Sequence, residues 1–206
     1  VIPGNTIEFS FGVVDAENVV NLGNITSATT IPDNTILTGT LTSNVKVSIA
    51  AGATVTLYNA TINAINKSDY MFAGLTCEGD ATLILADGTT NTVTGFERGY
   101  PAIQVAHNSG SGDEYTLTIR GNGSLNASTS YISGWTGAAI GGNINDDACG
   151  NIVIEGGNIT ANCGNTSAAI GSAYYKKCGN ITISGGTINA SASFAGSGIG
   201  SASSSN

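Results

Sequence analysis

Aromatic side chains recur at one position in a chain that is otherwise rich in Gly, Ser, Thr and Asn. Trp135 lies six residues before Gly141, and Phe194 lies six residues before Gly200. Asn165 takes the equivalent position in the segment between them. Flat aromatic rings stack on the apolar faces of pyranose sugars, while neighbouring amide and hydroxyl groups hydrogen-bond the sugar hydroxyls. This spacing therefore indicates a candidate surface for binding a glycan.

Further aromatic residues precede equivalent segments nearer the N-terminus. Phe96 and Tyr100 precede one such segment, and Tyr70 and Phe72 precede an earlier one. Two interpretations of Phe72 and Phe96 are open, because a ring without a polar tip either faces a ligand or plugs the interior. Arg98 is expected to donate hydrogen bonds to sugar hydroxyls. The candidate ligand-binding residues are Trp135, Tyr131, Phe194, Tyr100, Asn165 and Arg98.

A second group of aromatic residues is expected on a different corner of the fold. Tyr174 and Tyr175 follow the segment Ala168 to Ser172 and stand beside Lys176 and Lys177. Two interpretations are open for this group: a second contact patch, or a solvated loop.

These residues must be positioned by a repeating architecture. The block CGNIVIEGGNITA at 149–161 recurs as CGNITISGGTINA at 178–190, at an offset of 29 residues. A second marker keeps the same period, as AAIGG at 138–142, AAIGS at 168–172 and SGIGS at 197–201. Its isoleucines, Ile140, Ile170 and Ile199, lie 30 and 29 residues apart. Self-similarity at such a period is the signature of a solenoid.

Within each unit, apolar and polar residues alternate and Gly pairs end the runs, as in the segment 180–186. This alternation predicts short strands rather than helices. Three strands in about 29–35 residues fit one rung of a right-handed parallel β-helix better than a propeller blade. Because rungs stack about 4.8 Å apart, Trp135 and Phe194 would lie roughly 10 Å apart along the coil. That distance approaches the two-sugar repeat of an extended β-1,4-linked chain.

Looser copies extend the coil towards the N-terminus. Leu83 aligns with Leu117 at an offset of 34 residues, and Ile119 aligns with Ile154 at an offset of 35. Residues 1–40 lack the repeat markers and contain two of the three prolines. We therefore expect an irregular N-terminal capping segment over residues 1–40 and a parallel β-helix over residues 41–206.

Composition and charge limit the classes of partner. The 14 acidic and 6 basic residues give a net charge of −8, which argues against nucleic acid and against strongly anionic polysaccharides. A neutral partner is expected instead. No apolar run approaches the roughly 20 residues of a membrane span, so no membrane insertion is expected.

The sequence offers little for catalysis or metal binding. Hydrolysis of a glycoside needs two carboxyl groups across the bond. Asp113 and Glu114 form one adjacent acidic pair, which is expected at the surface, and Asp146 and Asp147 form a second. This pair could bind Ca²⁺ through several oxygens, but a solvated turn is the preferred interpretation. No cofactor and no enzymatic activity are expected.

The four cysteines divide into two kinds. Cys149 and Cys178 occupy the same place in successive rungs, where the spacing permits a disulfide. Two stacked, buried thiols are the open alternative. Cys77 and Cys163 are two rungs apart, so both are expected to be free.

The strings ADGTTNTVTG, GAAIGGN, CGNIVIEGGNITA and CGNITISGGTINA resemble repeats in secreted surface proteins of gut bacteria. Over residues 81–201, the chain resembles the right-handed β-helix carbohydrate-binding modules of bacterial xylan-degrading enzymes, carbohydrate-binding module family 89. The resemblance implies non-catalytic binding of xylan or another β-1,4-linked glycan, a secreted or cell-surface location in bacteria, and linkage to a catalytic domain that the module would target to its substrate. A surface adhesin or structural spacer is the alternative function, and a β-helical polysaccharide lyase or hydrolase is a further one.

Overall fold

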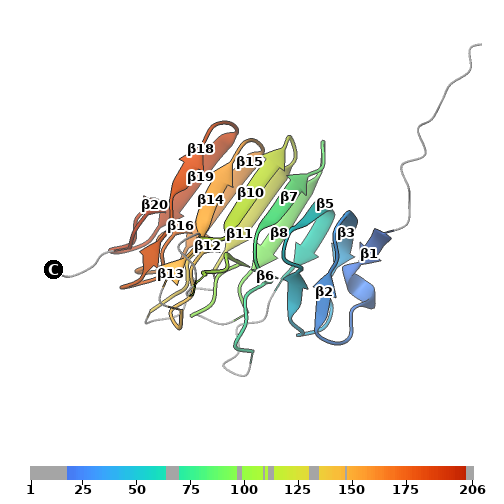
Figure 1. Ribbon diagram of the computed structural model, residues 1–206, viewed down its shortest axis with the longest axis horizontal. Helices are drawn as coiled ribbons and strands as arrows, with labels where there is room; N and C mark the ends of the chain where they lie inside the picture. The colour runs from blue at the N-terminus through green and yellow to red at the C-terminus, as the bar shows by residue number, and fades with distance from the viewer. Residues whose placement is uncertain are drawn as a thin grey trace, which may run out of the picture.

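The chain folds as a parallel β-helix. The computed structural model describes residues 18–63, 70–96, 99–108, 110, 114–129, 135–146 and 148–202. Every strand pair in these residues is parallel, and the partners come from successive rungs. Figure 1 shows the rungs stacked along one axis, from the N-terminal strands to the C-terminal ones. The predicted solenoid is confirmed.

Each complete rung contributes one strand to each of three faces. The first face contains β7 (Ala81–Leu85), β10 (Thr116–Gly121), β14 (Asn151–Ile154) and β18 (Ile181–Ile183). The second face contains β8 (Thr90–Thr94), β11 (Ser124–Ser128), β15 (Asn158–Cys163) and β19 (Thr187–Ala192). The third face contains β2 (Thr29–Ile31), β4 (Val47–Ile49), β6 (Leu75–Cys77), β9 (Ile103–Gln104), β12 (Ile140–Gly141), β16 (Ile170–Gly171) and β20 (Ile199–Gly200).

One long strand joins the first and second faces into one sheet. β5 (Ala53–Ile62) pairs with β7 through its first half and with β8 through its last two residues. β3 (Thr35–Thr40) runs beside β5, and their register shifts between Thr38 and Gly39, where the chain turns the corner. In later rungs separate strands take the place of each half.

The N-terminal segment carries regular strands of its own. β2 and β3 lie within the segment that the sequence indicated as irregular, and they pair with β4 and β5. β1 (Val19–Asn21) pairs with β3, and the short 3₁₀ helix η2 (Leu22–Asn24) follows it. Leu22 is fully buried at this end of the core. Residues 1–17 lie outside the described residues.

The interior is a set of stacked aliphatic ladders. Alternation along each strand points every second side chain inward. One ladder joins Leu83, Ile119 and Ile154, all fully buried, and each such side chain contributes about 1.5–3 kcal/mol by its removal from water. The ladder ends at Ile183 in the last rung, whose side chain is 42% exposed.

The register corrects one predicted alignment. Leu83 pairs with Ile119, not with Leu117, whereas the predicted pairing of Ile119 with Ile154 is confirmed. The difference is two residues. Because side chains alternate with a period of two, this slip keeps the same side chains inside the coil.

The cysteines behave in two ways. Cys149 and Cys178 form a disulfide between β13 (Ala148–Cys149) and β17 (Lys177–Cys178), with their Cα atoms 4.6 Å apart. Cys77 and Cys163 are free and buried, as predicted. Burial raises the pKa of the Cys77 thiol to about 12, because the interior disfavours the thiolate. Nowhere in the described part of the chain is there a helix of the length and apolarity needed to span a membrane.

Candidate functional site

Three aromatic rings contact one another on a surface in the C-terminal half of the coil, which we call the aromatic ridge: exposed Trp135, half-buried Tyr174 and exposed Tyr175. The ring centroids of Trp135 and Tyr174 are 5.8 Å apart, with 30° between their planes. Tyr174 contacts Tyr175 edge-on, with centroids 4.0 Å apart. Trp135 is 61% exposed and Tyr175 is 50% exposed. A surface of adjacent rings is therefore open to a ligand.

The ridge exists because the chain reverses tightly around each third-face strand. β16 is only two residues long, and the Ala168 N–H donates to the carbonyl oxygen of Ser172 at 3.0 Å. The segments before and after such a strand therefore lie side by side. The Tyr174 N–H donates to Ser167 Oγ at 2.9 Å, and the Ser167 hydroxyl in turn donates to the carbonyl oxygen of Thr136, next to Trp135. The expectation that Tyr174 and Tyr175 lie on a different corner from Trp135 was wrong.

Glycine is required at the turn inside this reversal. Gly141 and Gly171 have φ values of 140° and 134°, a backbone region that side chains rarely adopt. A Cβ atom at Gly171 would also collide with the backbone of Gly200 in the next rung. The repeated marker AAIGG, AAIGS and SGIGS, which we call the GIG marker after its last copy, therefore reflects a backbone requirement of the corner that carries the ridge.

The electrostatics of the ridge concern its phenols. The pKa of Tyr174 is raised, first by a side-chain hydrogen bond with Tyr175, then by partial desolvation and by the charge of Tyr175 if it ionises. The Tyr174 phenol is therefore a neutral hydrogen-bonding group at pH 7. It can donate to or accept from a hydroxylated ligand.

Phe194 lies in the equivalent connection two rungs beyond Trp135. The pairing of Ile140 with Ile170 and of Ile170 with Ile199 confirms the predicted equivalence of the three segments. Phe194 is 79% exposed, and its ring contacts no other aromatic ring among the described residues. Asn165, half-buried, occupies the connection between the two. The role of these residues in binding stays a prediction.

Tyr100 belongs to the connection one rung before Trp135. Its side chain is half-buried, and its phenol oxygen accepts a hydrogen bond from Asn145 Nδ2 at 3.0 Å. The Ile144 N–H donates to the carbonyl oxygen of Gly99 at 3.0 Å. The segment after β12 thus packs on the segment before β9, just as Tyr174 packs on Trp135. The candidate residues Tyr131 and Arg98 lie outside the described residues.

The aromatic residues of the N-terminal half form a second cluster, which we call the aromatic plug: Tyr70, Phe72 and Phe96. The Phe72 and Phe96 centroids are 4.7 Å apart, and Tyr70 lies 6.2 Å from Phe96. Phe96 is only 1% exposed, and Phe72 packs against the core. Of the two open interpretations of Phe72 and Phe96, the structure supports the interior plug.

Asp146, one member of the acidic pair considered for Ca²⁺, lies in a hydrogen-bonded turn. Asp146 Oδ2 accepts hydrogen bonds from Gln104 Nε2 at 2.9 Å and from Asn143 Nδ2 at 2.7 Å. The Asp146 N–H donates to Asn143 Oδ1 at 2.8 Å. Asp147 lies outside the described residues, and within those residues no three His, Cys, Asp or Glu side chains group as metal ligands. The turn interpretation accounts for the contacts of Asp146.

Comparison with known families agrees with this architecture. Residues 152–174 and 181–203 each match the family model described as a beta helix repeat, and these two segments are consecutive rungs. Together with the stacked parallel strands, the match identifies the chain as a β-helix protein. No curated protein and no solved structure matches the chain.

Proposed function

We propose that the chain is a non-catalytic carbohydrate-binding module that holds an extended, neutral β-1,4-linked glycan, with xylan as its ligand. The observation that carries the proposal is the aromatic ridge, in which Trp135 is 61% exposed beside Tyr174 and Tyr175. An exposed Trp contributes nothing to a spacer, since a coil is held together by its interior. Its ring offers a flat apolar face to the axial C–H groups of a pyranose.

The repeat supports an extended ligand rather than a single sugar. Equivalent positions in neighbouring rungs are about 4.8 Å apart, so Phe194 lies roughly 10 Å along the coil from the equivalent position at Trp135. The half-buried Asn165 occupies the same position in the rung between them. Rings spaced by two rungs match alternate sugars of a stretched chain, and Asn165 offers a polar group between them.

The choice of xylan depends on the resemblance of the repeat strings to modules of xylan-degrading enzymes. The same resemblance suggests an attached catalytic domain and a secreted or cell-surface location in bacteria. The disulfide between Cys149 and Cys178 supports this location, since such bonds persist in oxidising compartments. By holding an attached enzyme near its substrate, the module would raise the effective concentration of that substrate.

A non-catalytic role is supported by the contacts of the described acidic residues near the ridge. Asp146 is hydrogen-bonded to Gln104 and Asn143, and Glu114 lies 2.8 Å from the imidazole of His107. Hydrolysis would need two carboxyl groups facing each other across the scissile bond. We therefore assign the aromatic surface to binding alone.

The test is calorimetry and affinity electrophoresis against xylan, mixed-linkage glucan, mannan and cellulose. We expect xylan to bind, and we expect Trp135→Ala to weaken binding at least about tenfold because it removes the largest exposed ring. Phe194→Ala should weaken the binding of long xylan chains more than the binding of short oligosaccharides. Tyr58→Ala serves as the matched control, because Tyr58 is exposed on β5 away from the ridge.

Three outcomes would contradict the proposal. If no polysaccharide retards the wild-type chain, the adhesin or spacer alternative replaces it. If Tyr58→Ala weakens binding as much as Trp135→Ala does, the ridge is not the site. Release of reducing sugars from xylan or pectin would restore the enzymatic alternative.

A further inference from the structure

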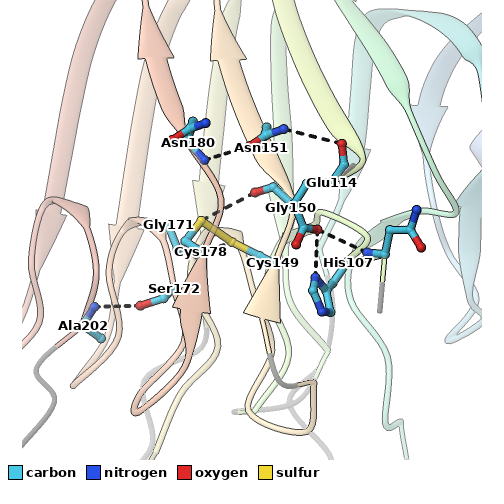
Figure 2. The surroundings of a disulfide bond; sticks show 11 residues. His107, Glu114, Cys149, Gly150, Asn151, Gly171, Ser172, Cys178, Asn180 and Ala202 are labelled. Carbon is cyan, nitrogen blue, oxygen red and sulfur yellow. Dashed lines mark hydrogen bonds and ion pairs between the residues drawn. A yellow bond between two sulfur atoms is a disulfide. The ribbon is translucent and has the colours of Figure 1, made fainter. Parts of the chain in front are cut away.

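A polar cleft of about 600 Å³ lies beside the aromatic ridge. His107 and Glu114 line one part of it, and Tyr175, Lys176 and Lys177 line another. The disulfide of Cys149 and Cys178 also lines the cleft, and Figure 2 shows His107 and Glu114 beside this bridge. A volume of this size accommodates one or two pyranose rings.

The carboxylate of the cleft is already engaged. Glu114 Oε2 lies 2.8 Å from His107 Nδ1 and accepts a hydrogen bond from the Asn108 N–H at 3.3 Å. Its negative charge is therefore directed towards its own neighbours rather than towards a ligand. The wall formed by β10 and the segment before it is thus fixed in place.

The two ammonium groups of the cleft are not engaged in the same way. Lys177 is exposed and Lys176 is half-buried, and neither forms an ion pair with any residue that the structure describes. They account for two of the six basic residues of a chain with a net charge of −8. The cleft is therefore a local positive site on an acidic protein, and its two ammonium groups would attract an anionic group.

The cleft is continuous with the aromatic ridge through Tyr175. This residue lines the cleft and contacts Tyr174, which in turn contacts Trp135. A glycan lying on the ridge would bring a branch to the mouth of the cleft. The half-exposed ring of Tyr175 is available as a platform at that junction.

We propose that the cleft binds the carboxylate of a hexuronic acid carried as a branch on the neutral glycan. This inference rests on the function proposed above, because it takes the backbone of the glycan to lie on the ridge. Lys176 and Lys177 would pair with the carboxylate, and Tyr175 would contact the sugar ring. A single carboxylate suits the site better than a dianionic phosphate, since Glu114 leaves one negative charge in the wall.

This assignment is compatible with the overall charge of the chain. A polymer of uronic acids would bring many negative charges close to a protein of net charge −8 and would be repelled along its length. An isolated acidic branch on a neutral backbone brings one charge, and it meets the two lysines. The cleft would thus distinguish a decorated from an undecorated backbone.

The experiment compares xylotriose with xylotriose carrying one glucuronic acid branch, by calorimetry at about 0.05 M and about 0.5 M NaCl. We expect the branched sugar to bind the wild type about threefold to tenfold more tightly at low salt, and the preference to shrink at high salt. Lys176→Gln/Lys177→Gln should remove the preference and leave the affinity for xylotriose unchanged. Lys46→Gln/Arg120→Gln is the matched control, because it removes two positive charges elsewhere and should keep the preference.

Each other outcome decides a separate point. Equal binding of the two sugars by the wild type, or a preference that survives Lys176→Gln/Lys177→Gln, would overturn the inference while the proposed function stands. Free glucuronate binding as tightly as the branched sugar would show a site for a small acid, not for a branch. If neither oligosaccharide binds and xylan does not bind, the proposed function itself fails and the inference with it.

Discussion

The aromatic plug and the aromatic ridge contain the same kinds of residue, but they face in opposite directions. In the plug, Phe96 is 1% exposed and its ring lies 4.7 Å from that of Phe72. In the ridge, Trp135 is 61% exposed although its ring lies 5.8 Å from that of Tyr174. The plug lies in connections between second-face and third-face strands, and the ridge takes one ring, Trp135, from such a connection. The difference shows that one corner of a coil can either seal the interior or build an outer surface.

The cause of the difference is the set of partners that each ring finds. The plug draws its three rings from two connections that precede third-face strands, so the rings pack on the core side. The ridge combines a ring from before β12 with two rings from after β16, and these segments meet outside the coil. A ring that packs across the core stabilises the fold, whereas a ring that packs across two outer loops remains available to a ligand.

The largest effect expected from this comparison is on stability. Phe96→Ala should lower the free energy of unfolding by about 3–5 kcal/mol, because it leaves a cavity in the plug. Trp135→Ala should change it by no more than about 0.5 kcal/mol, as at other exposed positions. Urea unfolding followed by circular dichroism measures both. Equal losses for the two variants would remove the distinction between plug and ridge.

The next effect concerns the covalent link beside the ridge. Cys149→Ser/Cys178→Ser should lower the free energy of unfolding by about 2–4 kcal/mol, since the bridge closes a loop of 29 residues. The double variant should also weaken glycan binding, because the bridge anchors the segment that carries Tyr174 and Tyr175. Equilibrium unfolding and calorimetry measure the two losses.

Thiol titration provides the control for that experiment. The unfolded wild type should show two reactive thiols without reductant and four with it, while the folded protein should react slowly because Cys77 and Cys163 are buried. Four thiols without reductant would exclude the bridge.

The free thiol Cys77 makes stability depend on pH. Burial raises its pKa to about 12 in the folded state, whereas the unfolded-state pKa is near 9.0. The contribution of Cys77 to the free energy of unfolding is therefore fully present below pH 9.0, and it is lost as the pH rises towards 12.

The smallest expected effect is at the turn beneath the ridge. Gly171→Ala should cost about 1–3 kcal/mol of stability, because φ there is 134° and the new Cβ would meet the backbone of Gly200. It should also weaken binding, since the turn aligns the segments that carry the rings. Gly110→Ala is the matched control, as nothing lies within 4 Å of a Cβ at that exposed position. If both variants melt at the same temperature, the corner tolerates side chains and the GIG marker has another cause.

Much of the fold was predictable because its determinants are local and repeated. The 29-residue offset between Cys149 and Cys178 gave the register of the last rungs directly. The alternation of apolar residues predicted short strands, and the two-residue error at Leu83 left the same side chains inside the coil. Nearer the N-terminus, insertions in the loops made the offsets between rungs unequal. The strands within residues 29–40 were not predicted, because this segment lacks the Gly markers.

The candidate site was predictable only in part. The spacing of Trp135 and Phe194 from the GIG marker identified one corner correctly, and the register confirms their equivalence. The approach of Tyr174 to Trp135 was missed, because it joins two different rungs across a chain reversal. The hydrogen-bonding Ser167 beneath them gave no signal in the sequence beyond its place before the marker.

The sequence by itself determined that this chain is a coil of short parallel strands, because a hydrophobic alternation and a fixed period are properties of neighbouring residues. Only the tertiary structure decided which rings are buried and which meet at the surface. Those contacts depend on how loops from successive rungs fold over a two-residue strand, and such long-range packing produces no periodic pattern in the sequence.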